Sequence, residues 1–133
     1  MATRRNWVIV ASRDHAMRGV EGGFVMANHG KRAPLAGMSR GDGVFIYSPT
    51  TTFPRGAPLR AITIVGEITG EAPEPSEVIA GGFRRRASLR AIEPLPLDDV
   101  RGHLPVSRIR FGCFELDPAD ARAIWSLVDQ PRP

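Results

Sequence analysis

Short apolar runs, broken by turns rich in glycine and proline, make up most of this chain of 133 residues. Residues 7–11 contain only apolar side chains, three of them β-branched, which predicts a strand that is buried on both faces. Residues 44–47 predict a second strand of the same kind. Residues 59–68 are rich in β-branched side chains but contain one glycine, which predicts a long strand that bends or bulges near Gly66.

A further strand is predicted at residues 83–92, where side chains of different character alternate. The alternation places one polar set on a single face of this strand: Arg84, Arg86, Ser88 and Arg90. Residues 108–111 predict a short strand that ends at Gly112.

Helices are expected to be few and mostly short. A helical turn is predicted over residues 14–17, with Ser12 as its N-cap and Gly19 as its end. Single helical turns are also predicted within 33–38 and within 98–103.

The clearest helix is predicted at the end of the chain. Asp117 is a suitable N-cap, and Pro118 fits the first helical position because its missing N–H would have no partner there. Apolar side chains at helical spacing then predict a stripe that packs on the sheet: Ala121, Ile124 and Val128.

The order of these elements predicts the fold class. Residues 48–56 and 70–77 contain two prolines each and are interpreted as loops. Strands outnumber helical spacers, so the chain is expected to form an α+β, mostly β domain of five or six strands that curls into a small barrel. The length predicts a single domain over residues 1–133.

The charge of the chain is carried almost entirely by arginine. Seventeen arginines and one lysine, Lys31, oppose 14 acidic residues, for a net charge of +4 and a pI near 10.5. A basic chain favours an anionic partner. An arginine-rich, lysine-poor composition is equally expected from a G+C-rich genome. Position favours the first reading, because three arginines share one face of the strand at 83–92.

Cysteine content and the start of the chain suggest where the protein works. Cys113 is the only cysteine, so no intramolecular disulfide can form and a cytoplasmic location is expected. The apolar run at 7–11 is too short for a signal peptide or a membrane span. No contact with a membrane is expected.

Common catalytic and metal-binding motifs are missing from the sequence. It contains no phosphate-binding P-loop, no dinucleotide-binding glycine turn and no zinc-protease helix motif. Its histidines and its cysteine do not fall at the close spacings that build zinc sites. No metal and no cofactor are therefore expected.

The segment that follows the first strand combines Ser12, Asp14 and His15. These are the side chains of an acyl-transfer site, but near neighbours on one turn seldom form the relay that such a site needs. Capping of the turn is one alternative. A second is that these groups lie at the mouth of a pocket and hydrogen-bond a planar ligand.

Aromatic side chains beside two strands offer such a pocket a stacking surface. Tyr47 is followed by Ser48 at the end of one strand, and Trp7 begins another. A ring next to a hydroxyl suits a nucleic-acid base, which stacks on the ring and hydrogen-bonds through its edge. Both rings are equally compatible with the core.

Ordered segments between residue 6 and residue 124 carry a further inference: 6–15, 19–24, 29–31, 34–35 with Met38, 41–42, 47–49, 52–53, 61–67, Phe83 with 85–86, and 110–112. Together they resemble the EVE domain family, part of the PUA-like superfamily that also contains YTH and ASCH domains. The resemblance implies a PUA-like pseudobarrel with short peripheral helices and a C-terminal helix. It implies binding of a modified or flipped base in DNA or RNA, without catalysis.

The resemblance also implies which residues form the site. The implied base-binding pocket consists of Trp7, Ser12, His15, Gly23, Phe24, His29, Lys31, Tyr47 and Ser48. The candidate phosphate contacts beside it are Arg13, Arg84, Arg85 and Arg86.

Three positions depart from the family pattern. Met26 stands where a glutamine is usual, and Gly37 where a basic residue is usual. Residues 104–107 lack the tryptophan that often precedes the late arginine and glycine segment. These departures leave the fold expectation intact and make the identity of the ligand the open question.

Three functional hypotheses follow. The first is a non-enzymatic reader of a base in single-stranded or flipped form. The second is a hydrolase of nucleoside-like small molecules, with His15 as base assisted by Asp14 or Ser12. The third is a structural partner protein whose pocket has lost its ligand.

Overall fold

The computed structural model describes residues 4–77 and 79–130. In this part of the chain, seven strands form one sheet in the order β2-β6-β4-β3-β1-β7, with β5 paired to β6. The strands are β1 (Asn6–Val10), β2 (Phe24–Val25), β3 (Gly43–Thr50), β4 (Pro58–Ile68), β5 (Glu74–Pro75), β6 (Phe83–Pro96) and β7 (Cys113–Glu115). The helices are α1 (Arg13–Gly22), α2 (Arg32–Ala36), α3 (Leu97–Val100), the 3₁₀ helix η1 (Val106–Phe111) and α4 (Pro118–Asp129).

One parallel strand pair organises the sheet. β1 and β3 run parallel, with Trp7 beside Val44 and Val10 beside Tyr47, whereas the other pairs are antiparallel. A parallel pair needs a crossover, and here the crossover contains α1, β2 and α2. The carboxyl ends of β1 and β3 therefore meet at one edge of the sheet.

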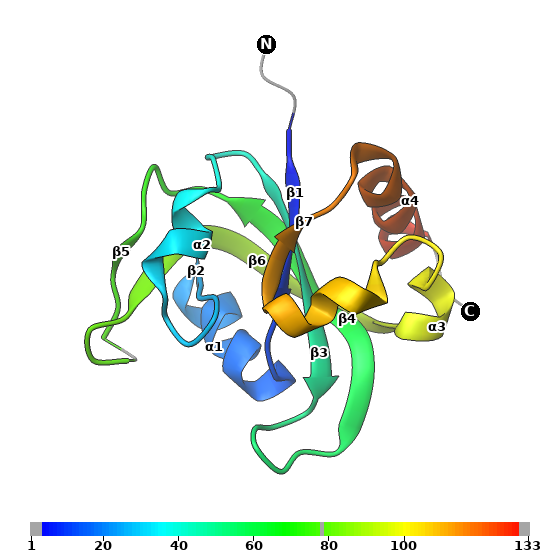
Figure 1. Ribbon diagram of the computed structural model, residues 1–133, viewed down its shortest axis with the longest axis horizontal. Helices are drawn as coiled ribbons and strands as arrows, with labels where there is room; N and C mark the ends of the chain where they lie inside the picture. Colours follow the sequence, from blue (N-terminus) through cyan, green and yellow to red (C-terminus); the bar gives the residue numbers. More distant parts are fainter. Residues whose placement is uncertain (1–3, 78, 131–133) are drawn as a thin grey trace.

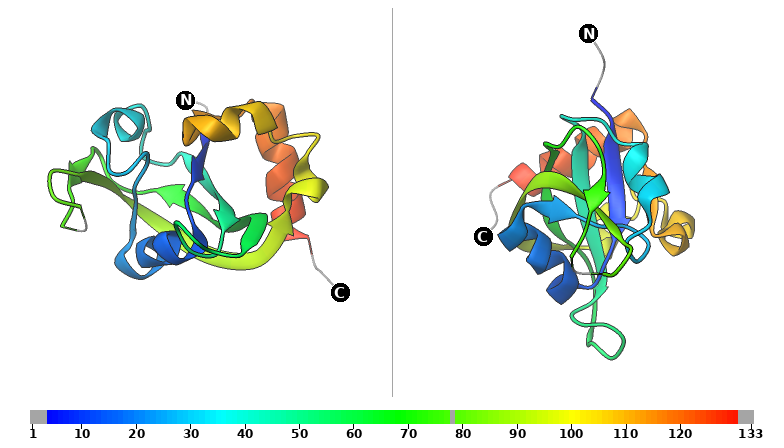
Figure 2. Two further views of the ribbon diagram at one scale, coloured as in Figure 1. Left: turned by 60° about the horizontal axis from the view of Figure 1, so that its bottom comes forward. Right: turned by 90° about the vertical axis from the view of Figure 1, so that its left-hand side faces the viewer.

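Each face of the sheet packs against its own helices. Figure 1 shows α1 and α2 on one side of the sheet and α3 and α4 on the other. Side chains alternate between the two cores, because Ile9 and Ile46 face α1 while Val8 and Phe45 face α4. The sheet curls into a half-barrel (Figure 2). The expected α+β, mostly β fold is confirmed.

An irregularity at Thr63 allows this curvature. The pairing of β4 with β6 shifts register between Ile62 and Ile64, and β3 shifts at the same level. Because of the shift, Ile62 and Val65 face the same core although they are three positions apart, an odd number that would place them on opposite faces of a regular strand. The bend was expected near Gly66, which instead allows β6 to come close: a Cβ there would lie 2.9 Å from the Cα of Leu89.

Several elements are longer than predicted, or begin elsewhere. β3 continues through Pro49 to Thr50, beyond the end of its pairing with β1, so that the missing proline N–H costs no ladder bond on that side. The loop predicted at 70–77 contains the short strand β5. β6 extends to Pro96, beyond its predicted end at residue 92, and α3 follows at once, one residue before the range in which a helical turn was predicted.

Two predictions around Gly19 and Gly112 were wrong. Helix α1 runs past Gly19, whose lack of a side chain lets the helix contact the main chain of Phe24. The expected strand at 108–111 is the 3₁₀ helix η1, because the strand that pairs with β1 begins only at Cys113. Gly112 ends η1 with a φ of 78°.

The C-terminal helix forms where it was predicted. Ala121 and Ile124 are buried in the core that α4 shares with the sheet, and the Trp125 ring lies 4.6 Å from the Phe45 ring. Asp117 occupies the N-cap position but makes no side-chain capping bond. None of the helices in residues 4–77 and 79–130 is long and apolar enough to span a membrane.

Candidate functional site

Three segments meet where β1 and β3 end. The backbone N–H of Ala11 donates to the carbonyl of Tyr47 at 3.1 Å, and that of Asp14 donates to Thr51 at 2.9 Å. The end of η1 joins them, because the N–H of Val10 donates to the carbonyl of Gly112 at 2.9 Å. These bonds hold the first turn of α1, the β3–β4 connection and the end of η1 together.

A fourth segment, the turn at residues 28–30, closes this arrangement. Asn28, His29 and Gly30 all have a positive φ, which is uncommon for two successive residues other than glycine. The His29 ring lies 6.3 Å from the Phe53 ring at an angle of 54°. The Asn28 side chain packs so tightly against Gly112 that it would contact any Cβ placed there. We call residues 11–15, 28–31, 49–55 and 109–112 the loop cluster.

His15 is the half-buried titratable group of the loop cluster. Burial lowers the pKa of its imidazole, and the charges of Arg18 and His29 lower that pKa further. A neutral imidazole offers one donor and one acceptor, the combination that reads the edge of a base. Ser12 lies at the N-cap of α1 but makes no capping bond, so the predicted cap is not formed.

Two phenylalanines of the loop cluster are exposed. The side chain of Phe53 is 76% exposed and that of Phe111 is 53% exposed. Neither was proposed as a site residue from the sequence, where each appeared only within a segment of the family resemblance. The available signal was an aromatic residue next to a turn residue, Pro54 in one case and Gly112 in the other.

The loop cluster carries positive charge. It contains four cationic side chains and one carboxylate, that of Asp14. Among the described residues, these four cations form no ion pair with a carboxylate. They are Arg13, Lys31, Arg55 and Arg110. Arg18 follows the first segment of the cluster by three residues and Arg108 directly precedes the last segment, and both equally lack a carboxylate partner in residues 4–77 and 79–130.

The arginines of β6 have partners instead. Glu74 on β5 accepts from Arg84 at 2.9 Å and lies 3.3 Å from the guanidinium of Arg86. The side chain of Arg90 is 3.2 Å from the carboxylate of Asp129 on α4. The expected alternation of β6 is present, but its basic face is partly neutralised by these carboxylates.

Arg85 points into the core and is only 2% exposed. Its guanidinium donates to the main-chain carbonyls of Leu35 at 2.7 Å, Met38 at 2.6 Å and Gly70 at 3.0 Å. Burial lowers the pKa of Arg85, and the carboxylates of Asp42 and Glu71 oppose that shift. A phosphate would have to displace these carbonyls to reach it.

Trp7 lies at the far end of β1 from the loop cluster. It is buried, its indole N–H donates to the Asp42 carboxylate at 2.9 Å, and the Arg5 guanidinium lies 4.7 Å from the ring centroid. The exposed Gly37, one of the departures from the family pattern, would place a Cβ 3.5 Å from this ring.

Tyr47 and Ser48 are buried on opposite faces of β3. Tyr47 is 3% exposed, belongs to the core on the α4 side, and has its pKa raised by burial. The Ser48 hydroxyl is hydrogen-bonded to that of Thr63 at 2.8 Å. The structure therefore gives both side chains core partners.

Phe24 and Gly23 sit at the end of α1. Phe24 is buried, with the Arg84 guanidinium 5.4 Å from its ring centroid, and Gly23 ends the helix with a φ of 76°. Of the nine pocket residues expected from the sequence, the structure brings together four in the loop cluster: Ser12, His15, His29 and Lys31.

Met26 supplies an apolar floor beneath the turn at 28–30. It is buried, and a Cβ on Gly30 would lie 3.4 Å from its terminal methyl group. Its sulfur accepts a bond from the Ser76 hydroxyl at 3.8 Å. A glutamine here would offer hydrogen bonds where methionine offers apolar surface.

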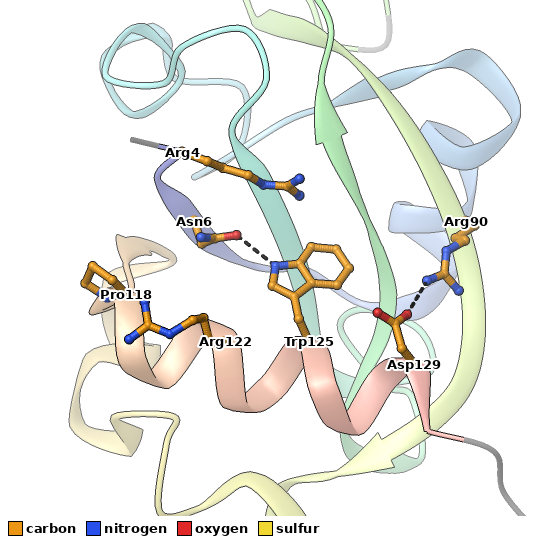
Figure 3. Close-up of a pocket in the computed structure, with 7 residues that line it drawn as sticks. All are labelled: Arg4, Asn6, Arg90, Pro118, Arg122, Trp125 and Asp129. Atoms are coloured by element: carbon orange, nitrogen blue, oxygen red, sulfur yellow. Dashed lines mark hydrogen bonds and ion pairs between the residues drawn. The ribbon is translucent and has the colours of Figure 1, made fainter. Parts of the chain in front are cut away.

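A hollow of about 530 Å³ lies beside α4, near the amino end of β1. Figure 3 shows that its polar groups face one another. The Trp125 N–H donates to Asn6 at 2.8 Å, Arg4 lies 5.2 Å from the Trp125 ring, and Arg90 pairs with Asp129. The loop cluster, at the other end of β1, presents more groups without partners. In residues 4–77 and 79–130, no cluster of three metal-ligating side chains occurs.

Comparison with known proteins identifies relatives in sequence and in fold. The UPF0310 protein of Mycolicibacterium vanbaalenii is 39% identical over 95% of this chain and 94% of its own length. The YTH domain of the Zygosaccharomyces rouxii MRB1 protein, solved in complex with N6-methyladenosine RNA, has a TM-score of 0.71 at 12% identity, over 100% of this chain and 89% of that one. Human THYN1, solved in complex with 5-methylcytosine containing DNA, has a TM-score of 0.58 at 11% identity, over 96% and 99%.

A family model supplies the assignment. The model of the EVE domain matches residues 5–127, which include every helix and strand described above except the last two residues of α4. The chain therefore belongs to the EVE domain family.

Proposed function

We propose that this protein is a non-enzymatic reader of a modified or extruded base in DNA or RNA, and that the base binds at the loop cluster. One observation carries the proposal. Four segments that are distant in sequence converge at the ends of β1 and β3. Together they present the half-buried His15 imidazole, exposed aromatic rings and cations that have no carboxylate partner in the described part of the chain.

The structural neighbours support the choice of ligand class. The YTH domain was solved with RNA that contains N6-methyladenosine, and human THYN1 with DNA that contains 5-methylcytosine. Both share the fold of this chain. We therefore infer that this chain uses the shared fold to bind a modified base.

The chemistry of the loop cluster suits a base and its phosphates. His15 and Ser12 can hydrogen-bond a base edge, while His29 and Phe53 offer ring faces. Extruding a base costs a few kcal/mol, and one stacked base returns about 1–3 kcal/mol. Specific binding therefore also needs the cations, such as Arg13 and Lys31, to contact phosphates.

The contacts of His15 favour binding over hydrolysis. Among the described residues, no hydrogen bond joins its ring to Ser12 or to Asp14. The exposed Asp14 uses its N–H to hold the Thr51 carbonyl. A relay for proton transfer is not assembled.

A panel of oligonucleotides tests the proposal. Matched DNA and RNA strands, unmodified or carrying N6-methyladenine or 5-methylcytosine, are titrated by fluorescence anisotropy. At least one modification is expected to tighten binding by about tenfold, equivalent to roughly 1.4 kcal/mol. His15→Asn should bring that ratio toward one. His103→Asn is the matched control, since His103 bonds to Asp120 on the α4 side.

Two results would contradict the proposal. The first is indifference to every modification at every salt concentration. The second is product formation from a nucleoside or oligonucleotide, detected by chromatography, that is lost in His15→Asn. That outcome would establish the hydrolase hypothesis instead.

A further inference from the structure

Phe53 and Phe111 are exposed although the fold offers apolar cores on both faces of the sheet. In the described residues, only one other large apolar side chain is exposed, that of Val106 at 40%. Exposing a phenylalanine forgoes favourable burial of its ring. Two such rings at one end of a small domain indicate a surface that contacts a partner.

The segments that carry the two rings both contact the turn at 28–30. Phe53 faces the His29 ring at 6.3 Å. Phe111 precedes Gly112, which packs against the Asn28 side chain. A line from Phe53 through His29 and Asn28 to Phe111 therefore crosses the loop cluster from the β3–β4 connection to η1.

The β3–β4 connection presents Phe53 on an internally bonded turn. Thr51 exchanges hydrogen bonds with Ala57, at 3.0 Å from its N–H and at 3.1 Å to its hydroxyl. The Thr50 hydroxyl donates to the Thr52 carbonyl at 2.7 Å. A backbone held in this way loses little freedom when a ligand stacks on its side chain, which favours affinity. The connection projects from the end of the sheet in both Figure 1 and Figure 2.

Each ring has cations beside it that lack carboxylate partners in residues 4–77 and 79–130. Arg55 follows Phe53 by two residues, and the Arg110 guanidinium lies 4.9 Å from the centroid of the Phe111 ring. Alternating ring faces and cations fit a ligand with flat apolar groups and regularly spaced negative charges. Single-stranded nucleic acid has this chemistry, whereas a paired duplex hides the faces of its bases.

We propose that Phe53 and Phe111 are stacking platforms for the bases on either side of the recognised base. A single strand then crosses the loop cluster between η1 and the β3–β4 connection, with Arg55 and Arg110 near its phosphates. This inference rests on the proposed function and deepens it by naming the form of the substrate.

Alanine substitutions of the platforms test the inference. Phe53→Ala and Phe111→Ala are titrated with a labelled, unmodified single-stranded octamer and with the same octamer in a duplex. Each variant is expected to bind the single strand about five- to 150-fold more weakly than the unsubstituted protein does, the range for loss of one stacked base. Each should bind the duplex as well as the unsubstituted protein does. Phe53→Tyr and Phe111→Tyr should retain binding because they keep the ring.

Val106→Ala is the matched control, because Val106 is exposed on η1 but has no ring to stack. It should bind both forms as the unsubstituted protein does. Circular dichroism checks that each variant folds, which is expected because both phenylalanines are more than half exposed.

The outcomes separate this inference from the proposed function. If both alanine variants bind the single strand normally, the platforms are disproved, even where a preference for a modified base persists. If they weaken single strand and duplex equally, or change only self-association, the inference also fails. If they weaken the single strand while no modification is preferred, the platforms stand and the proposed function fails.

Discussion

Two regions of this domain each gather several arginines, and the arginines of the two regions have different partners. On β6, Arg84 and Arg86 share the Glu74 carboxylate, and Arg85 is enclosed by main-chain carbonyls. Around the loop cluster, arginines such as Arg13 and Arg110 have no carboxylate partner in the described chain. The first group stabilises the fold, and the second remains available to an anion.

The difference teaches that a local density of arginine does not by itself identify an anion site. The run at 84–86 is the densest in the sequence, yet its carboxylate and carbonyl partners come from residues 10 to 50 positions away. Whether an arginine is available to an anion depends on those partners. The predictions below test this contrast.

The largest effect is expected for Arg85→Met. The substitution removes the guanidinium that donates to the carbonyls of Leu35, Met38 and Gly70, of which the Leu35 carbonyl keeps one other donor, the N–H of Met38 at 3.3 Å. An unsatisfied buried group costs about 1–3 kcal/mol. The free energy of unfolding, measured in urea, should fall by about 3 kcal/mol. Arg86→Met is the control and should lose under about 1 kcal/mol, because its ion pair is half exposed. Equal losses would show that burial does not separate the two arginines.

A smaller effect is expected on binding when Arg108 and Arg110 are both replaced by glutamine. Each phosphate contact contributes about 0.7 to the slope of log affinity against log salt for a single strand. The double variant should bind a single-stranded oligonucleotide about tenfold more weakly at 0.1 M salt, with a slope shallower by about 1.4.

The matched comparison replaces Arg84 and Arg86 by glutamine, and both quantities should change much less. The two double variants remove the same charge from the chain. If they weaken binding equally, net charge rather than the loop cluster governs affinity.

Replacement of Glu74 should make the arginines of β6 more like those of the loop cluster. Glu74→Gln releases Arg84 and Arg86 from their shared carboxylate. Non-specific affinity for nucleic acid should rise by a few fold, with a steeper salt dependence, while any preference for a modified base is unchanged. An unchanged salt dependence would mean that the β6 face does not meet the ligand even when it is free.

The smallest effect concerns pH and His15. Burial, Arg18 and His29 hold its pKa below the ordinary value of 6.5, and protonation would remove the acceptor with which the neutral imidazole reads a base edge. The preference for a modified base should therefore fall by a few fold as pH falls from 8 to 5.5, and His15→Asn should flatten the profile.

Folding depends on the protonation of this group in the same direction. The unfolded chain binds the His15 proton more tightly, so the lowered pKa removes stability as pH falls below about 6.5. In urea titrations at pH 5.5, His15→Asn should be less sensitive to acid than the unsubstituted protein. The same acid sensitivity in both proteins would show that His15 is not desolvated.

The sequence was sufficient for most of the fold because its apolar runs have few alternatives. The runs at 7–11 and 44–47 could only be buried strands, and α4 had both a start signal and an apolar stripe. The segment at 108–111 could not be assigned in this way. Its conformation depends on which residues pair with β1, and that contact is non-local.

The candidate site was predicted only in part for the same reason. Ser12 and His15 were proposed from the polar segment that follows the first strand, and the family resemblance added His29. Tyr47 was included although the side of the sheet that it faces depends on strand pairing. Phe53 and Phe111 were missed because exposure cannot be read from an isolated aromatic residue.

The five residues of β1 separate two tasks along one strand. Near its amino end, the Trp7 indole is hydrogen-bonded to Asp42, and at its carboxyl end the chain enters the loop cluster. Substitutions at one end therefore need not disturb the other. Side chains of the loop cluster can therefore be exchanged while the anchor at the opposite end keeps the domain folded, so the stability of the scaffold and the chemistry of its loops are free to vary separately.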